Sequence, residues 1–122
     1  MSHHRQMTER NCAEQIQRVQ REAIEKFKAL LKERVGGQDY QLFEPDEETM
    51  ANGLYPTDLI VVLPKLPSSL EENLNLRKPI DDAYWQVWEE YQPKLGELFF
   101  HVMVFYPDEV GQVGDAWRKI PL

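Results

Sequence analysis

The sequence predicts a small α/β (α+β) domain with a long N-terminal helix, a mixed sheet of about three strands, and one or two crossover helices. Three observations support this fold class. A helical pattern of apolar residues fills the first third of the chain, two continuous apolar runs of strand length follow, and an amphipathic helical stretch separates these runs. With 122 residues, 42% of them hydrophobic, the chain has the size of one domain spanning 1–122.

Residues 8–36 are predicted to form the long helix, after a disordered segment at 1–7. Thr8 suits the helix start, and Gly36 and Gly37 suit its end, because glycine adopts a left-handed conformation without steric cost. A helix of this length exceeds the width of a small domain, so its N-terminal part should project. Apolar residues recur along it at steps of three and four, which favours packing on the sheet or on a second chain: Ile16, Val19, Ala23, Ile24, Phe27, Leu30 and Leu31.

The mixed α/β body is predicted at 38–112 and begins with a strand at Asp39–Glu44. A loop rich in proline, glycine and acids follows, and then the apolar run "DLIVVLP" begins at Asp58. A continuous apolar run is typical of a strand that is covered on both faces. We expect these two strands to pair antiparallel across the loop.

Two helical segments are predicted between the second and third strands. Ser69 with Glu72 forms a capping-box pattern that predicts a short helix from Leu70. A second segment follows Pro79 and carries an apolar stripe as far as Tyr91, with Pro93 and Gly96 expected to end it.

The third strand is predicted within Leu98–Pro107, which is too apolar to be exposed on either face and holds His101 as its only ionisable residue. A strand, helix, strand passage implies a right-handed crossover between parallel strands. Residues 113–122 are predicted to be a short tail from which Trp117 folds back onto the core.

The charge of the chain is unevenly distributed. Residues 1–37 hold eight Lys/Arg and five Asp/Glu, a balance of +3, whereas residues 38–122 hold six and sixteen, a balance of −10. Such an acidic body repels phosphates, so we expect no direct nucleic-acid binding. A basic protein partner, a metal-chelated substrate or no charged partner would each fit this charge, and an acidic surface that only solubilises the protein is the simplest interpretation. The chain has no apolar run long enough for a membrane span and no signal-peptide pattern, and Cys12 has no second cysteine to pair with, so we expect a cytoplasmic protein without membrane contact.

Three phrases carry a family resemblance: "YQLFE", "TDLIVVLPKLP" and "FHVMVFYPDEV". With the helix before them, they resemble the minimal nucleotidyltransferases of the polymerase-β-like superfamily, small proteins often encoded as antitoxins beside a helical ribonuclease partner. The resemblance covers about residues 8–112 and implies a nucleotidyltransferase-like fold. In that family a Gly-Ser turn cradles a triphosphate, while an Asp-x-Asp pair and a third Asp hold Mg²⁺.

The chemically demanding positions of that family pattern are replaced in this sequence. The Gly-Ser pair falls on Glu44-Pro45, the Asp-x-Asp falls on Pro56-Thr57-Asp58, and the third acid falls on His101. Nucleotidyl transfer needs two Mg²⁺ ions held by several carboxylates, because hard cations prefer oxygen ligands. The resemblance therefore implies a degenerate site without Mg²⁺ or another cofactor.

Our leading prediction is a catalytically inactive, nucleotidyltransferase-like domain that binds another protein as an antitoxin-like or regulatory module. A second hypothesis is an active nucleotide-binding or nucleotidyl-transferring enzyme with reassigned residues: Asp58, His101 and a loop acid from Glu44, Asp46, Glu47 and Glu48. A third is an unrelated α/β protein that forms a homodimer through its long helix. The candidate contact residues for a partner are Ile16, Val19, Phe27, Trp85 and Trp88.

An alternative role is open for Asp58 and His101. If their strands lie side by side, a carboxylate–imidazole pair could bind a transition metal or perform acid–base chemistry. The simpler interpretation is a charge at a strand start and a histidine satisfied within the core.

Overall fold

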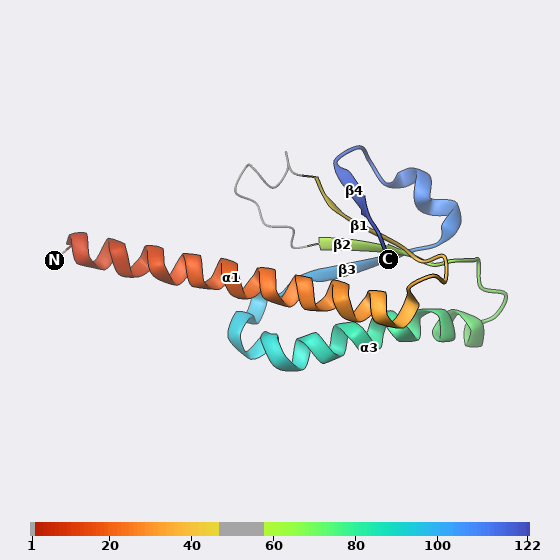
Figure 1. Ribbon diagram of the computed structural model, residues 1–122, viewed down its shortest axis with the longest axis horizontal. Coiled ribbons are helices and arrows are strands. Elements are labelled where there is room, and N and C mark those ends of the chain that lie inside the picture. Colours follow the sequence, from red (N-terminus) through yellow and green to blue (C-terminus); the bar gives the residue numbers. More distant parts are fainter. Residues whose placement is uncertain (1, 47–57) are drawn as a thin grey trace.

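The computed structural model describes residues 2–46 and 58–122, with side chains described from Glu14 onward. Two helices lie against one face of a mixed four-stranded sheet (Figure 1). In chain order the elements are α1 (Ser2–Val35), β1 (Gln41–Pro45), β2 (Asp58–Val62), α3 (Leu70–Leu95), the 3₁₀ helix η1 (Gly96–Leu98), β3 (His101–Phe105), the 3₁₀ helix η2 (Pro107–Gln112) and β4 (Trp117–Ile120). The mixed α/β class is confirmed.

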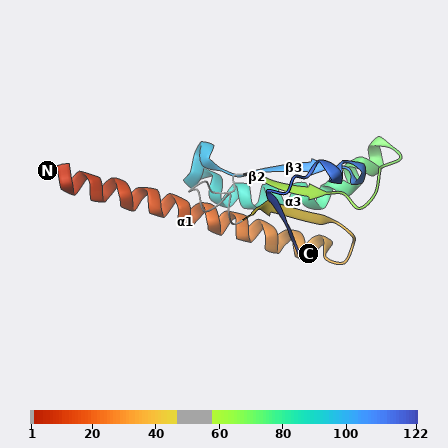
Figure 2. The same cartoon turned by 90° about the horizontal axis from the view of Figure 1, so that it is seen from above.

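Helix α1 is longer than the sequence predicted. It begins at Ser2 rather than Thr8, so the helix includes most of the segment that we expected to be disordered. It ends at Val35, and Gly37 then adopts a φ of 79°, the left-handed conformation expected after the helix. The N-terminal part extends well beyond the sheet, as predicted (Figures 1 and 2).

The sheet has the strand order β3-β2-β1-β4. The predicted antiparallel pairing of β1 with β2 and the parallel pairing of β2 with β3 are both confirmed. The expected count of three strands was too low, because the tail at 113–122 contains β4, which pairs antiparallel with β1. Pairing with β1 also explains why Trp117, placed opposite Pro45, is only partly exposed.

Helix α3 is one continuous helix where we predicted two segments. The predicted N-cap is confirmed, since the Ser69 hydroxyl accepts a hydrogen bond from the Glu72 N–H at 3.1 Å. Pro79 and Pro93 lie inside the helix, which ends at Leu95. Proline removes one helical hydrogen bond, but Leu76 before Pro79 and Ile80 after it both pack on the core, and this burial favours continuation.

The core lies between the sheet and the two helices. Leu59 and Val61 of β2 point into it, while Ile60 and Val62 lie on the opposite face and are also buried, so the predicted coverage of both faces of β2 is confirmed. The same prediction for β3 was wrong. Met103 is 38% exposed and His101 is exposed, because β3 is the edge strand of the sheet. Within the described part of the chain, neither long helix is apolar enough to cross a membrane.

Candidate functional site

The structure brings Asp58 and His101 together. They are register partners at the start of the parallel strands β2 and β3. Because alternate residues of a strand point to opposite faces, both lie on the face away from the helices, whereas Leu59 and Val102 point toward them. Asp58 is half-buried and His101 is exposed.

Among the described residues, no further metal-ligating side chains gather around this pair. No hydrogen bond or ion pair joins the two side chains, and within residues 14–46 and 58–122 no three histidine, cysteine or acidic side chains gather closely enough to hold a metal ion. In open sheets with parallel strands, ligand sites lie at the carboxyl ends of the strands, and this pair lies at the opposite end. Of the other proposed reassigned acids, Glu47 and Glu48 lie outside the described residues, as does Pro56-Thr57.

Glu44 is the buried charged group of the described core. Glu44 is 4% exposed. Its carboxylate accepts hydrogen bonds from Lys28 of α1 and from Arg118 of β4, the latter at 2.5 Å. Burial alone would raise the pKa of Glu44, but the two cationic donors outweigh it and hold this pKa below its usual value. The carboxylate is therefore ionised at neutral pH and ties β1 to α1 and β4.

The same arrangement removes the phosphate-binding turn that the resemblance would place at Glu44-Pro45. Both residues belong to strand β1, where they pair with Arg118 and Trp117 of β4. A turn that binds phosphate needs free backbone N–H groups, and proline has none. The two cations beside Glu44 are also committed to that carboxylate. A triphosphate could not bind here as it binds in the family.

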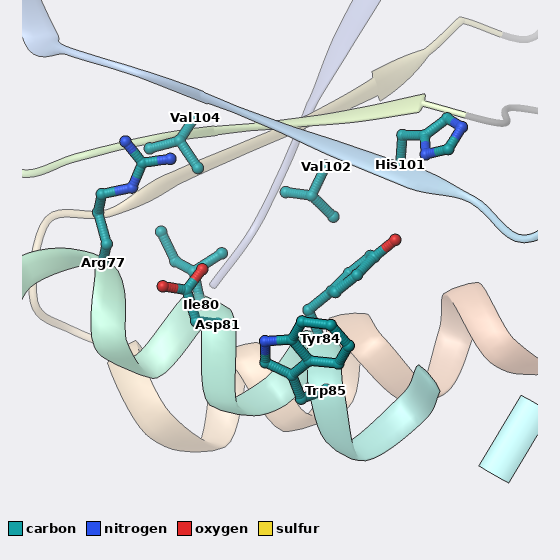
Figure 3. Close-up of a pocket in the computed structure, with 8 residues that line it drawn as sticks. All are labelled: Arg77, Ile80, Asp81, Tyr84, Trp85, His101, Val102 and Val104. Carbon is teal, nitrogen blue, oxygen red and sulfur yellow. The ribbon is translucent and has the colours of Figure 1, made fainter. Parts of the chain in front are cut away.

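The described surface has a groove between α3 and the edge strand β3, with a volume of about 300 Å³ (Figure 3). Helix α3 supplies one wall and β3 the other. We call it the α3–β3 groove, and its lining residues are Arg77, Ile80, Asp81, Tyr84, Trp85, His101, Val102 and Val104. His101 borders the groove from the edge strand, although its ring lies on the other side of β3 from the side chain of Val102 (Figure 3).

A cluster of aromatic side chains forms the base and one end of this groove. The Tyr84 hydroxyl donates a hydrogen bond to the Phe100 carbonyl at 2.9 Å, which fixes the ring beside β3. The Tyr84 ring contacts those of Trp85 and Trp88, at centroid distances of 6.2 and 6.4 Å. Trp85 is 56% exposed, so most of a large apolar surface is presented to solvent on a rigid support.

The charged side chains of the groove have no partners in the described residues. Arg77 and Asp81 reach from α3 toward β3, and neither is hydrogen-bonded or ion-paired with any residue in 14–46 or 58–122 (Figure 3). Two neighbouring charges of α3 do have partners: Asp82 pairs with Arg34 at 3.9 Å, and Glu90 pairs with Lys26. The groove thus combines an apolar wall with two charges of opposite sign that are available to a ligand.

The five residues predicted to bind a partner differ in their exposure to solvent, and only some of them lie at the surface. Trp85 is at the surface, and Trp88 is half-buried behind it. Ile16 of α1 is 36% exposed, and Val19 packs against the core. Phe27 is fully buried and belongs to the core.

Comparisons with known proteins identify no relative: no family model, no curated protein and no solved structure matches this chain.

Sequence reasoning did not identify Arg77, Tyr84 or Asp81 as groove residues. Tyr84 falls within the apolar stripe predicted after Pro79, and Asp81 is one of two acids near the start of that segment. Helix α3 continues through Pro79, and this places Arg77 and Asp81 about one turn apart beside β3, where both line the groove. The available sequence signal was Trp85, a large aromatic residue that lies outside the apolar stripe of an amphipathic helix.

Proposed function

We propose that this chain is a non-catalytic α/β domain that binds another protein through the α3–β3 groove, as an antitoxin-like or regulatory module with a degenerate nucleotidyltransferase-like fold. The observation that carries the proposal is the exposure of Trp85 on a rigid aromatic cluster beside an edge strand. Tryptophan is among the residues most enriched at the energetic centres of protein interfaces.

The charge distribution supports a basic partner. The balance of −10 over residues 38–122 attracts a basic surface and increases its rate of association. The buried ion pairs of Glu44 and the incomplete acid set at Asp58 support a role without nucleotidyl transfer.

Replacing Trp85 tests the interface directly. We expect Trp85→Ala to weaken partner binding about 30-fold or more, the effect of losing a tryptophan at the centre of an interface. Leu74→Ala is the matched control, because Leu74 is 59% exposed on the same helix but does not line the groove. Both proteins are purified with their partners from the native host, and the partner, identified by mass spectrometry, is titrated against each. Equal affinity of Trp85→Ala and wild type would contradict the proposed interface.

A second candidate function is nucleotide binding by an enzyme with reassigned residues. The adjacency of Asp58 and His101 favours it, since a carboxylate and an imidazole at one position can share a ligand. We expect calorimetry with ATP or GTP and Mg²⁺ to detect no binding up to millimolar ligand, because the described residues beside this pair supply no further carboxylate. Binding that is lost in Asp58→Asn would instead support the enzyme.

The third hypothesis, a homodimer through α1, stays a prediction. The exposed Ile16 is the observation that favours it, since an apolar residue on a projecting helix can pack against a second copy. Light scattering measures the mass of the particle and separates a monomer of 14.4 kDa from a dimer.

A further inference from the structure

The open edge of the sheet borders the α3–β3 groove. Strand β3 pairs with β2 on one side, and within residues 2–46 and 58–122 no strand pairs with its other side. Edge strands are commonly protected by lysine, proline or a bulge, but His101–Phe105 contains neither lysine nor proline and keeps a regular register with β2. Such an edge is a ready template for another strand.

The register identifies the backbone groups that face outward. The Leu63 N–H donates to the Phe105 carbonyl at 2.9 Å, so the backbone groups of Phe105 face β2. Successive residues of a strand direct their backbone N–H and C=O groups to opposite edges. The backbone groups of Met103, two residues before Phe105, therefore also face β2. The N–H and C=O groups of Val102 and Val104 face the open edge, while their side chains line the groove.

Three side chains of α3 beside this edge are spaced like the side chains on one face of a strand. Arg77, Asp81 and Trp85 follow one another at four-residue intervals on α3, a rise of about 6 Å per step. Side chains on one face of a strand recur every two residues, about 6.6 Å apart. Three successive inward side chains of an added strand would therefore lie opposite Arg77, Asp81 and Trp85 in turn.

The charges in this row select the occupant. Arg77 and Asp81 have no partner in the described residues, so an acid opposite Arg77 and a base opposite Asp81 would each gain an ion pair. The exposed ring of Trp85 favours a large apolar side chain. A second copy of the chain is disfavoured, because its body carries the same balance of −10 over residues 38–122.

We propose that the partner adds an extended segment to β3 as a fifth strand, with an acid, a base and a large apolar residue at alternate positions facing Arg77, Asp81 and Trp85. This inference rests on the proposed protein-binding function of the same groove and specifies the chemistry of the bound segment. The backbone of Val102 and Val104 supplies affinity, and the row on α3 supplies specificity.

Short synthetic peptides test the proposal. The probes carry Glu, Lys and Leu at alternate positions with Thr between them, in this order and in the reverse order, so that both strand directions are sampled. The controls exchange Glu and Lys. We expect one probe to bind about tenfold more tightly than its exchanged control, since two opposite-charge pairs become two like-charge pairs. Equal binding of probes and controls, or no binding, would overturn the proposal.

Amide hydrogen exchange of the wild-type protein locates the bound segment. In the free protein the Val102 and Val104 amides should exchange rapidly and those of Met103 and Phe105 slowly, and a saturating probe should slow the first two about tenfold or more. Val104→Pro removes an outward N–H and no bond to β2, and it should weaken probe binding about tenfold. Protection of Val102 and Val104 in the free protein, or no slowing with the probe, would count against strand addition.

The outcomes separate this proposal from the proposed function. If Trp85→Ala weakens binding of the native partner while Val104→Pro, verified as folded, leaves it unchanged, the groove binds the partner but strand addition is wrong. If Trp85→Ala has no effect, the proposed function itself fails. A dimer of the wild-type chain that dissociates in Val104→Pro would show that a second copy occupies the edge, and it would overturn the proposed occupant.

Discussion

Phe27→Ala should destabilise the domain by about 3–5 kcal/mol, the usual cost of removing a buried phenylalanine ring. Phe27 is fully buried, and its ring packs edge-on against Phe100 and Tyr84 at centroid distances of 5.5 and 6.4 Å. The ring joins α1 to α3 and to the residue that precedes β3. Since the free energy of unfolding of a single domain is about 5–15 kcal/mol, the substitution removes a large share of the total stability.

Urea denaturation followed by far-UV circular dichroism measures this effect. Ile16→Ala is the matched control on the same helix, because Ile16 is 36% exposed and the substitution should change the unfolding free energy by less than about 1 kcal/mol. A Phe27→Ala protein as stable as wild type would mean that α1 does not pack on the sheet in solution.

The second large effect is expected at Glu44. Glu44→Gln keeps the shape of the side chain but removes its charge. Lys28 and Arg118 each lose an ion pair, although Lys28 keeps its contact with the exposed Glu25. We expect a loss of about 1–3 kcal/mol, the range for hydrogen bonds to buried charged groups. The partly exposed Arg118 can recover hydration, which places the effect below that of breaking a fully buried pair.

The pH dependence of stability gives an independent measure of the same pair. The pKa of Glu44 in the folded state lies below the ordinary value of 4.5, so the unfolded chain takes up a proton first as the pH falls. The stabilisation is present above pH 4.5 and is lost as the pH falls through the folded-state pKa. Wild type should therefore lose stability more steeply than Glu44→Gln in this acidic window.

Glu90→Gln is the matched control for both measurements. It removes the anion of an ion pair with Lys26 whose side chains are 46% and 35% exposed. Water solvates both charges, so the effect on stability should be much smaller than at Glu44. If Glu44→Gln and Glu90→Gln have equal effects, or if the acid profile of Glu44→Gln matches wild type, Glu44 does not stabilise the fold as described.

The elements with the strongest sequence signals were predicted best. The continuous apolar run after Asp58 became β2, buried on both faces, and the strand, helix, strand order placed β3 parallel beside it. Strand β4 could not be recognised, because Trp117–Ile120 is short, has two cations at its centre and is stabilised by pairing with β1. Pro79 suggested a break in α3, but residues on both sides of it pack on one core.

The candidate site was predictable only in part. The adjacency of Asp58 and His101 followed from the expected crossover, and the structure confirms it. The groove, in contrast, arises from the edge position of β3 beside α3. Edge position depends on which strands pair, and the residues of β3 are apolar on both faces, so their sequence does not reveal it.

The projecting N-terminal part of α1 affects how the particle moves through solution. A helix of 34 residues is about 51 Å long, whereas a compact chain of 122 residues has a radius of gyration of about 14 Å. A rod attached to a small body increases friction, so the monomer should elute early from a size-exclusion column calibrated with spherical standards. An elution volume that matches a dimer is therefore not evidence of one, and the rotational correlation time should be anisotropic even for a single chain.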